Sequence, residues 1–369
     1  MQKKICLIYN FAQHYRLGIF KLLDQKLNCD FYFGNTMDDV KKLNYSELKH
    51  FKEELFNIKL ISRFYWQKGI FKILSQNYTD YIILGEYYCL STWYALIYSK
   101  FSNKKVYLWT HGWYGNEGSL KTIIKKAFFN LSDGIFLYGN WAKDLMVQEG
   151  FLEKKLHVIY NSLDYENQYR IRQNLKKETI FKDYFKNDFP VIIFIGRLTK
   201  IKKLNQIIET QKVLIEKGKN INVVFIGKGE EENTLKKQVN DLNLQENVWF
   251  YGPSYNEEEI GKLVYNADLC VSPGNVGLTA IHVMSYGTPV ATHKDFTMQM
   301  PEYEAIQDKQ TGFFFEKNSI NSMVTKIEDW IFENKYNREN IRDFCYKIID
   351  LKFNPDYQLK IIKSVIYES

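Results

Sequence analysis

Short apolar runs rich in β-branched and aromatic residues recur along the whole chain, and segments of helical length separate them. The runs are apolar at nearly every position rather than at alternate ones, which is typical of strands buried on both faces of a parallel sheet. We therefore expect two series of strands. The first comprises 4–9, 29–33, 81–85, 105–109, 134–138 and 156–160, and the second comprises 190–196, 221–227, 247–252, 268–272, 288–292 and 311–315.

The segments between these runs repeat their apolar residues with the period of an α-helix, as at 120–131 and 204–215. Alternating strands and helices predict doubly wound α/β domains, and the two series predict two such domains. The predicted parts are a first domain at 1–185, a second domain at 186–345 and a C-terminal helix at 346–369 that returns to the first domain.

The net charge of +7 falls on the first part of the chain. Residues 1–172 contain 24 Lys and Arg against 16 Asp and Glu. A basic half predicts an anionic partner, which could be nucleic acid, an anionic membrane surface or a phosphorylated substrate. The chain contains no recognisable nucleic-acid-binding motif, so we expect no nucleic acid among its partners.

Other sequence features favour a cytoplasmic protein. No stretch approaches the roughly 20 apolar residues that span a bilayer, and the apolar run at 4–9 is too short for a signal peptide. The five cysteines are scattered without a Cys-x-x-Cys pair, which is typical of reduced thiols. The chain has no Asp-x-Asp and no His/Cys cluster, so we expect neither a bound metal nor a cofactor.

Ligands of open α/β sheets bind beyond the carboxyl ends of the strands. Gly196 ends the strand at 190–196, Arg197 follows it directly, and Lys202 comes five residues after Arg197. A guanidinium fork and an ammonium group near a helix start are suited to a diphosphate. The alternative interpretation is an exposed basic turn, because "KIKK" is rich in lysine.

The stretch "PGNVGLTAIHVMSYGTPVAT" at 273–292 predicts a strand-to-helix turn whose backbone can approach a ligand. It contains no carboxylate, so we expect backbone N–H groups to bind an anion there, and a plain βα turn is the alternative. The candidate donor-binding residues of this turn are Gly274, Asn275, Val276, Gly277, Leu278, Thr279 and His282. Turns after the two preceding strands add Lys228, Tyr251 and Pro253.

The first half offers candidates at two strand ends. "NFAQHYR" at 10–16 places Gln13, His14 and Arg16 after the first strand, and "THGWYGNEG" at 110–118 places His111 and Glu117 after the fourth. A histidine at a strand end between Thr and Gly is a candidate for a binding or catalytic role, although a lone histidine is more often structural.

Four blocks of the second half resemble retaining glycosyltransferases of family 4. They are "IFIGRLTKIKKLNQIIE", "VVFIGKGEEENTLKKQV", the stretch from "VWFYGPSYNEEEI" to "GLTAIHVMSYGTPVAT", and "TGFFFEKN"; in the first half, "DGIFLYGNWAKDLMVQEGFLEKKLHVIYNSLDY" is also similar. The resemblance implies the GT-B fold, in which two Rossmann-like domains face a central cleft. It also implies that Arg197 and Lys202 hold the donor diphosphate, that 273–279 receives the diphosphate and donor sugar, and that His111 lies near the transferred sugar.

The chain departs from the family at two acidic positions. Family members carry two glutamates here, one facing the donor sugar and one facing the ribose, and these align with Gly274 and His282. A neutral imidazole can still hydrogen-bond a ribose hydroxyl, so His282 is a candidate for the second role. The sugar contacts would come from backbone or from elsewhere, with Glu302 and Glu304 as candidates. The glycine pair that usually follows the first strand is replaced by "NFAQHYR".

The expected function is transfer of a sugar from a nucleotide diphosphate sugar to a hydroxyl acceptor with retention, without a metal, in surface polysaccharide or glycolipid assembly. The acceptor-side candidates are Gln13, His14, Arg16 and Glu117. We expect a saccharide or lipid-linked acceptor and a peripheral position on the inner face of the cytoplasmic membrane, since 59–74 and 119–131 mix Lys and Arg with large apolar residues as interfacial helices do; ordinary core-facing helices are the alternative. The rival functions are a non-catalytic nucleotide-sugar-binding scaffold and a GT-B sugar-nucleotide epimerase.

Overall fold

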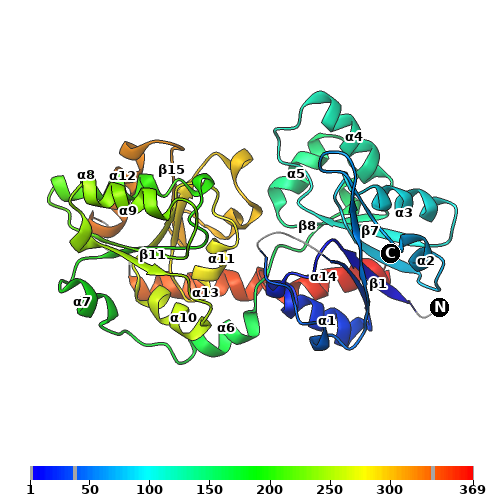
Figure 1. The fold of residues 1–369 in the computed structure, drawn as a ribbon, viewed down its shortest axis with the longest axis horizontal. Coiled ribbons are helices and arrows are strands. Elements are labelled where there is room, and N and C mark those ends of the chain that lie inside the picture. Colours follow the sequence, from blue (N-terminus) through cyan, green and yellow to red (C-terminus); the bar gives the residue numbers. More distant parts are fainter. Residues whose placement is uncertain (1–2, 36–39, 334–336, 369) are drawn as a thin grey trace. The chain divides into compact units, whose positions relative to one another are not determined.

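The computed structural model describes residues 3–35, 40–333 and 337–368. The chain divides into two compact units. Unit 1 comprises the described residues up to Asp164 and those from Asn354 onward, and unit 2 comprises Tyr165–Phe353. Each unit is built around one parallel sheet (Figure 1), as the two series of apolar runs predict.

Unit 1 contains a seven-stranded sheet in the order β3-β2-β1-β6-β7-β8-β9, with every pair parallel. All six expected strands are present. The strands are β1 (Ile5–Tyr9), β2 (Asp30–Gly34), β3 (Phe51–Leu55), β6 (Asp80–Leu84), β7 (Lys105–Thr110), β8 (Gly134–Leu137) and β9 (Leu156–Val158). The additional strand β3 is polar and lies at the edge of the sheet, so it lacks the continuous apolar pattern of its neighbours.

Helices cover both faces of this sheet (Figure 1). On one face Phe20 and Ile362 pack into a core that includes Leu7 and Phe136. On the other face the helical residues Leu96 and Phe128 join a second core. The helices are α1 (Leu17–Leu27) and α14 (Pro355–Glu368) on the first face, with α2 (Ile70–Leu74), α3 (Leu90–Lys100), α4 (Ser119–Asn130) and α5 (Asn140–Gln148) in the remainder of the unit.

Residues 59–74 do not form the interfacial helix that the sequence suggested. They contain part of an antiparallel hairpin, β4 (Asn57–Lys59) with β5 (Tyr65–Gln67), followed by the one-turn helix α2. Gly69 is the N-terminal cap residue of α2 and has φ +102°. This left-handed conformation is not helical, so the helix begins only after Gly69.

Unit 2 contains a six-stranded parallel sheet in the order β12-β11-β10-β13-β14-β15. Every strand expected in the second half is present: β10 (Val191–Ile195), β11 (Asn222–Ile226), β12 (Val248–Gly252), β13 (Leu269–Ser272), β14 (Val290–His293) and β15 (Gly312–Phe315). Numbered within the unit, this is the order 3-2-1-4-5-6 of a Rossmann sheet. Its helices are α6 (Tyr165–Arg172), α7 (Ile180–Phe185), α8 (Asn205–Glu216), α9 (Glu232–Asp241), α10 (Glu257–Asn266), α11 (Thr279–Met284), α12 (Ile320–Glu328) and α13 (Arg338–Lys352).

The unit boundary lies before α6, whereas the sequence placed the domain boundary at residue 185. Helices α6 and α7 pack against α10 of unit 2, where Ile171 and Phe185 are buried. Arg172 Nη2 also pairs with Asp350 Oδ2 of α13 at 2.6 Å. The predicted C-terminal segment at 346–369 is likewise divided: its first part continues α13 in unit 2, and α14 packs against α1 in unit 1.

Candidate functional site

The carboxyl ends of β10 and β13 form the point of unit 2 at which the strand order reverses. Ile192 and Ile193 of β10 pair with Leu269 and Cys270 of β13. Chains leaving adjacent parallel strands toward opposite sides open a crevice at such a point, and ligands of doubly wound sheets bind there. Residues 196–202 follow β10 and residues 273–278 follow β13, so the structure brings the two principal predicted segments together. We call this place the β10–β13 junction.

Lys202 links the two segments of the junction. Its Nζ donates hydrogen bonds to the backbone oxygen of Asn275 at 2.6 Å and to Asn275 Oδ1 at 2.8 Å. Burial lowers the pKa of Lys202 to about 8; attraction to Glu302 opposes this shift and repulsion from Arg197 adds to it. Arg197 itself is exposed. The junction therefore holds two neighbouring cations, one half-buried and one facing solvent.

Gly274 lies in direct backbone contact with the turn after β10. Its N–H donates to the carbonyl oxygen of Lys202 at 3.0 Å. A Cβ atom at this position would lie 2.0 Å from the carbonyl oxygen of Ile201 and 2.7 Å from Lys202 Cα, closer than real Cβ atoms approach other heavy atoms. No side chain fits at position 274, so the backbone arrangement itself excludes the first glutamate of the family pattern.

The start of α11 is held from within unit 2. The N–H of Val276 donates to Gln299 Oε1 at 2.9 Å, and Gln299 Nε2 in turn donates to Thr292 Oγ1 at 2.8 Å. Thr279 Oγ1 donates to the carbonyl oxygen of Ile195 at 3.0 Å. The N–H of Val276 is therefore not available to a ligand, contrary to the expectation of free amides. Gln299 has no signal in the sequence, because its role depends on how β14 packs beside β13.

Gly277 and Leu278 complete this turn. Gly277 has φ +54°, a conformation that favours glycine. Leu278 is half-buried and precedes α11 as its N-terminal cap residue. At the end of β10, Gly196 has φ +146°. Gly227 packs closely on it, because a Cβ added to Gly227 would lie 1.9 Å from the Gly196 carbonyl oxygen.

His282 contacts an acid that sequence reasoning missed. Its Nε2 lies 2.9 Å from Glu257 Oε1 at the start of α10, and the same oxygen accepts hydrogen bonds from Gln168 and Tyr286. Burial alone would raise the pKa of Glu257, but His282 and these hydrogen bonds lower it to about 2. Because a carboxylate only accepts, His282 Nε2 carries a proton, and in the neutral ring Nδ1 is the acceptor.

The three remaining donor candidates lie at the ends of β11 and β12. Lys228 is exposed after β11, and its carbonyl oxygen accepts from the N–H of Leu198 at 3.0 Å. Tyr251 and Pro253 lie at the end of β12, the edge strand beyond β11. Burial and a hydrogen bond to Glu259 raise the pKa of Tyr251 to about 12. Lys228 therefore contacts the segment that follows β10, whereas Tyr251 and Pro253 lie at the edge strand.

In unit 1, the predicted residues have different environments. His111 follows β7, and its Nδ1 is buried without a hydrogen-bond partner. Burial, with the nearby charges of Arg16 and Lys125, lowers its pKa to about 4, so the ring is neutral at pH 7. Gln13 is buried and pairs with Lys42 in an isolated β-bridge.

Glu117 and His14 hold structure around their own loops. Glu117 Oε1 accepts from Lys125 Nζ at 2.6 Å and from the N–H of Tyr114 at 3.1 Å, and Oε2 accepts from the N–H of Gly115 at 2.9 Å. These bonds fix the turn after β7, so the acceptor-side role predicted for Glu117 has no support from its contacts. His14 is exposed and lies 3.2 Å from the carbonyl oxygen of Lys41.

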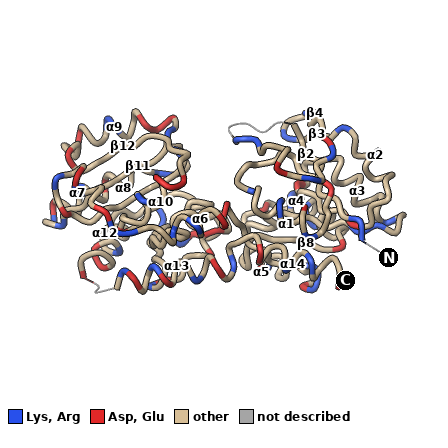
Figure 2. Tube along the Cα trace, turned by 90° about the horizontal axis from the view of Figure 1, so that it is seen from below, with Lys and Arg blue, Asp and Glu red and all other residues tan. Residues whose placement is uncertain are grey.

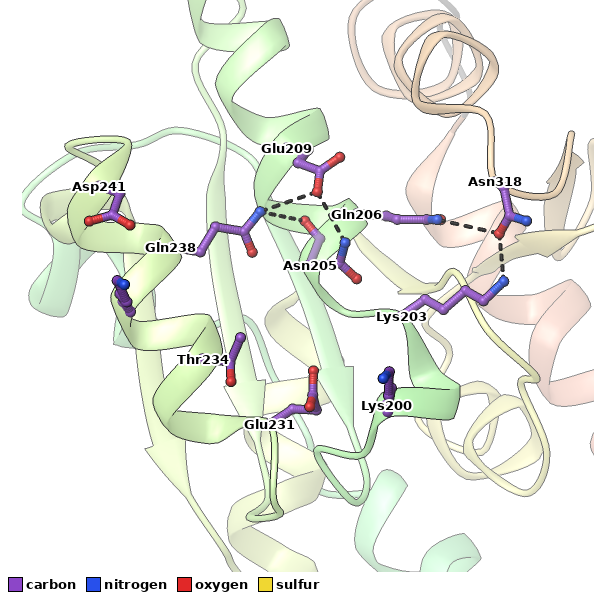
Figure 3. A pocket seen from close by; sticks show the side chains of 11 residues that line it. Lys200, Lys203, Asn205, Gln206, Glu209, Glu231, Thr234, Gln238, Asp241 and Asn318 are labelled. Atoms are coloured by element: carbon purple, nitrogen blue, oxygen red, sulfur yellow. Dashed lines mark hydrogen bonds between the residues drawn. The ribbon is translucent and has the colours of Figure 1, made fainter.

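A groove of about 680 Å³ in unit 2 lies between α8 and α9 and reaches the turn after β10. Figure 3 shows that its polar side chains point toward one another: Gln238 toward Asn205 and Glu209, and Lys203 toward Asn318. The lining comprises Lys200, Lys203, Asn205, Gln206, Glu209, Glu231, Thr234, Lys237, Gln238, Asp241 and Asn318. Acidic and basic groups alternate in it, so it has no single charge to select a ligand.

The described part of the chain shows neither a metal-binding cluster nor a membrane-spanning helix. No set of three or more His, Cys, Asp or Glu side chains there is placed to hold a metal ion. Among the same residues, no helix combines the length and the apolar character that crossing a membrane requires.

Solved structures that superpose on this chain include glycosyltransferases. Anabaena HepE, solved with UDP, superposes with a TM-score of 0.74 and 15% identity over 99% of this chain and 100% of that one. A glycosyltransferase from Rickettsia africae superposes with a TM-score of 0.75 and 17% identity over the whole of both chains. At this identity the likeness shows the fold alone, and it confirms the predicted GT-B class.

Two curated relatives match part of this chain. The poly(ribitol-phosphate) alpha-N-acetylglucosaminyltransferase of Staphylococcus aureus is 26% identical over 172 residues, or 46% of this chain and 33% of that protein. The capsular polysaccharide biosynthesis glycosyltransferase CapM of the same species is 25% identical over 237 residues, or 62% and 60%. The chain thus spans only 33% and 60% of the lengths of these relatives. Residues 176–346 match the family model of glycosyl transferases group 1, and this segment lies wholly within unit 2, which holds the β10–β13 junction.

Proposed function

We propose that the protein transfers a sugar from a nucleoside diphosphate sugar to a hydroxyl acceptor, with retention at the anomeric carbon. The observation that carries this proposal is the pair of cations, Arg197 and Lys202, at the β10–β13 junction. The match of residues 176–346 to group 1 glycosyl transferases supports it. So does the likeness to HepE, which has been solved with UDP-glucose.

In the proposed reaction, the bond between the anomeric carbon and the diphosphate oxygen breaks, and its electron pair leaves with the diphosphate. The acceptor oxygen bonds to the same face of the sugar, and its proton passes to a diphosphate oxygen. Arg197 and Lys202 stabilise the charge that develops on the leaving group. Electrostatic stabilisation of this kind contributes on the order of several kcal/mol, so we propose that the protein's own cations suffice without a metal.

We propose two groups that replace the missing glutamates. His282 Nδ1 can accept a hydrogen bond from a ribose hydroxyl, because the ring proton lies on Nε2, which donates to Glu257. Glu302 is buried, and its charge acts on Lys202, so its carboxylate lies close enough to the junction to be a candidate for the sugar hydroxyls. The contact of His111 with the transferred sugar stays a prediction.

The low pKa of Lys202 predicts a pH-dependent affinity for the nucleotide. Diphosphate binding favours the charged lysine and raises its pKa above the value of about 8 in the free protein. Below pH 8 the lysine is already charged, so affinity is flat; above pH 8 binding requires proton uptake and affinity falls by up to about tenfold per unit. Titration of UDP between pH 7 and 9 measures this slope. The Lys202→Arg variant stays charged over this range, so its UDP affinity should not fall with pH. An equal slope in the variant and the wild type would contradict the role of Lys202.

We propose a saccharide acceptor anchored in an anionic membrane, on the inner face of the cytoplasmic membrane. Helix α4 supports this, because Leu120 and Ile123 are 73% and 65% exposed beside Lys121 and Lys126. On the hairpin, Ile61 is also exposed. Figure 2 shows Lys and Arg interspersed with Asp and Glu over both units, so apolar insertion rather than a purely basic face would supply the binding.

Vesicle sedimentation tests the membrane proposal. The double variant Leu120→Ser/Ile123→Ser should bind phosphatidylglycerol vesicles about tenfold or more weakly, because two exposed apolar side chains no longer insert. Tyr255→Ser, which removes a similarly exposed side chain from unit 2, should leave binding unchanged. Equal binding by the double variant and the wild type would exclude α4 as the docking surface.

Turnover with nucleotide sugars tests the proposed function. Nucleotide release shows turnover, and NMR of the product gives the configuration at its anomeric carbon. The same configuration as in the donor identifies a retaining transferase, and the opposite one an inverting transferase. A non-catalytic scaffold is the second candidate, because Gly274 cannot carry the family glutamate; it would bind the nucleotide without releasing it from a donor. An epimerase would convert the sugar nucleotide without an acceptor.

A further inference from the structure

Unit 1 contains a buried guanidinium with no anionic partner. Arg16 lies in the 3₁₀ turn His14–Arg16 after β1, and its side chain is almost fully buried. Its Nη2 donates to Tyr138 OH at 2.6 Å, whereas Nε and Nη1 are buried without a hydrogen-bond partner. Among the residues that the structure describes, no carboxylate forms an ion pair with Arg16.

Aromatic rings surround this guanidinium. The rings of Tyr9, Tyr15, Trp109 and Tyr138 lie 5.5, 5.7, 5.5 and 5.2 Å from its central carbon. They stabilise the charge through cation–π contacts but offer no strong acceptor to the N–H groups. Tyr15 is half-buried, whereas the other three rings are buried, so Tyr15 is the part of the cluster that reaches solvent.

Two further nitrogen atoms beside Arg16 also lack partners. Trp109 Nε1 and His111 Nδ1 are buried without a hydrogen bond, and the rings of His111 and Tyr138 are 4.7 Å apart. Trp109 is in β7, His111 follows it and Tyr138 follows β8, so the cluster lies at the carboxyl edge of the sheet. This is the edge at which doubly wound sheets bind ligands.

The unsatisfied atoms share one chemical property. The guanidinium and indole N–H groups can only donate, and a neutral imidazole donates from Nδ1 when its proton is there. Buried polar groups in folded proteins are normally hydrogen-bonded, and buried charges are normally paired. What the cluster lacks is an acceptor, and a negatively charged one would also neutralise Arg16.

We propose that this edge of unit 1 binds an oxyanion carried by the acceptor, a phosphate ester or a sugar carboxylate, through Arg16, Trp109 Nε1 and His111 Nδ1. The inference deepens the proposed function by naming the acceptor class, and its link to an acceptor rests on that function. His111 suits the role because its ring is neutral at pH 7, so it adds a donor without adding a second charge.

Binding is measured in the full chain with the donor site disabled by Arg197→Met/Lys202→Met. Thermal unfolding is followed against sodium phosphate and, separately, sodium glucuronate, with ionic strength held constant by sodium chloride. We expect one of the two anions to raise the melting temperature, and the responding arm identifies phosphate or carboxylate as the group bound. Because the donor residues are absent, failure of the proposed glycosyl transfer would leave this result unaffected.

Arg16→Met in the same background should abolish the shift. It replaces the buried cation with an apolar chain of similar length, so the ligand-free protein should unfold at or above the temperature of its parent. Trp109→Phe keeps a large ring but removes one donor, and we expect it to weaken the affinity about tenfold. Arg63→Met is the control, because Arg63 is exposed while lying over the rings of Tyr87 and Tyr88. A shift in neither arm, or an unchanged shift in both Arg16→Met and Trp109→Phe, would overturn the proposal.

Discussion

Replacing Arg197 with alanine is expected to reduce turnover about 100- to 1,000-fold while leaving the fold intact. The side chain is exposed, so its removal leaves no buried polar group without a hydrogen-bond partner. We propose that Arg197 stabilises the charge on the leaving diphosphate. Removal of one preorganised donor from such a site lowers the turnover rate by about this factor. The measurement is initial-rate nucleotide release from the donor, with circular dichroism to verify the fold.

Lys200→Ala is the matched control for Arg197. Lys200 lies in the same turn, is also exposed, and lines the groove between α8 and α9 (Figure 3). We expect this variant to keep nearly normal turnover. Near-normal turnover in Arg197→Ala would remove the diphosphate role, and equal losses in both variants would point to general electrostatic attraction instead.

Gly274→Ala should destabilise unit 2 by about 3 kcal/mol and abolish nucleotide binding. The added Cβ would lie 2.0 Å from the carbonyl oxygen of Ile201 and 2.7 Å from Lys202 Cα, so the turns after β10 and β13 would have to separate. That separation breaks the hydrogen bond from the Gly274 N–H to the Lys202 oxygen and displaces Lys202 from Asn275. Chemical denaturation and UDP titration measure the two effects.

Gly118→Ala is the control for this substitution, since nothing lies within 4 Å of the Cβ that it would add. It should change stability by only a few tenths of a kcal/mol. For the same steric reason, Gly274→Glu should fail to restore a family-like site and should bind UDP no better than Gly274→Ala. Gain of activity in Gly274→Glu would show that the position can hold an acid and that our account of the junction is wrong.

The sequence predicted both sheets because their buried strands are apolar along their whole length. The polar edge strand β3 and the β4–β5 hairpin were missed, because an edge strand exposes one side and lacks that pattern. The domain boundary was placed too late for a related reason: α6 is mostly polar, and only a few residues, such as Ile171, show that it packs on unit 2.

The candidate site was predictable where it depends on chain order and not where it depends on contacts. Arg197 and Lys202 follow β10 in the sequence, so their place at the strand end could be inferred. The partners of other candidates come from distant segments: Glu257 for His282 and Gln299 for Val276. Spacing along a single chain carries no information about such pairs. The ion pair of Glu117 with Lys125 could not be inferred for the same reason.

The most direct test of the central claim is calorimetric titration of the wild-type protein with UDP, GDP, dTDP, CMP and ADP. If the β10–β13 junction is a nucleotide-sugar site, at least one nucleoside diphosphate binds with micromolar affinity, and Arg197→Ala loses most of that affinity. Absence of binding by every nucleotide at millimolar concentration would contradict the account. Binding that is unchanged in Arg197→Ala would move the site away from the junction.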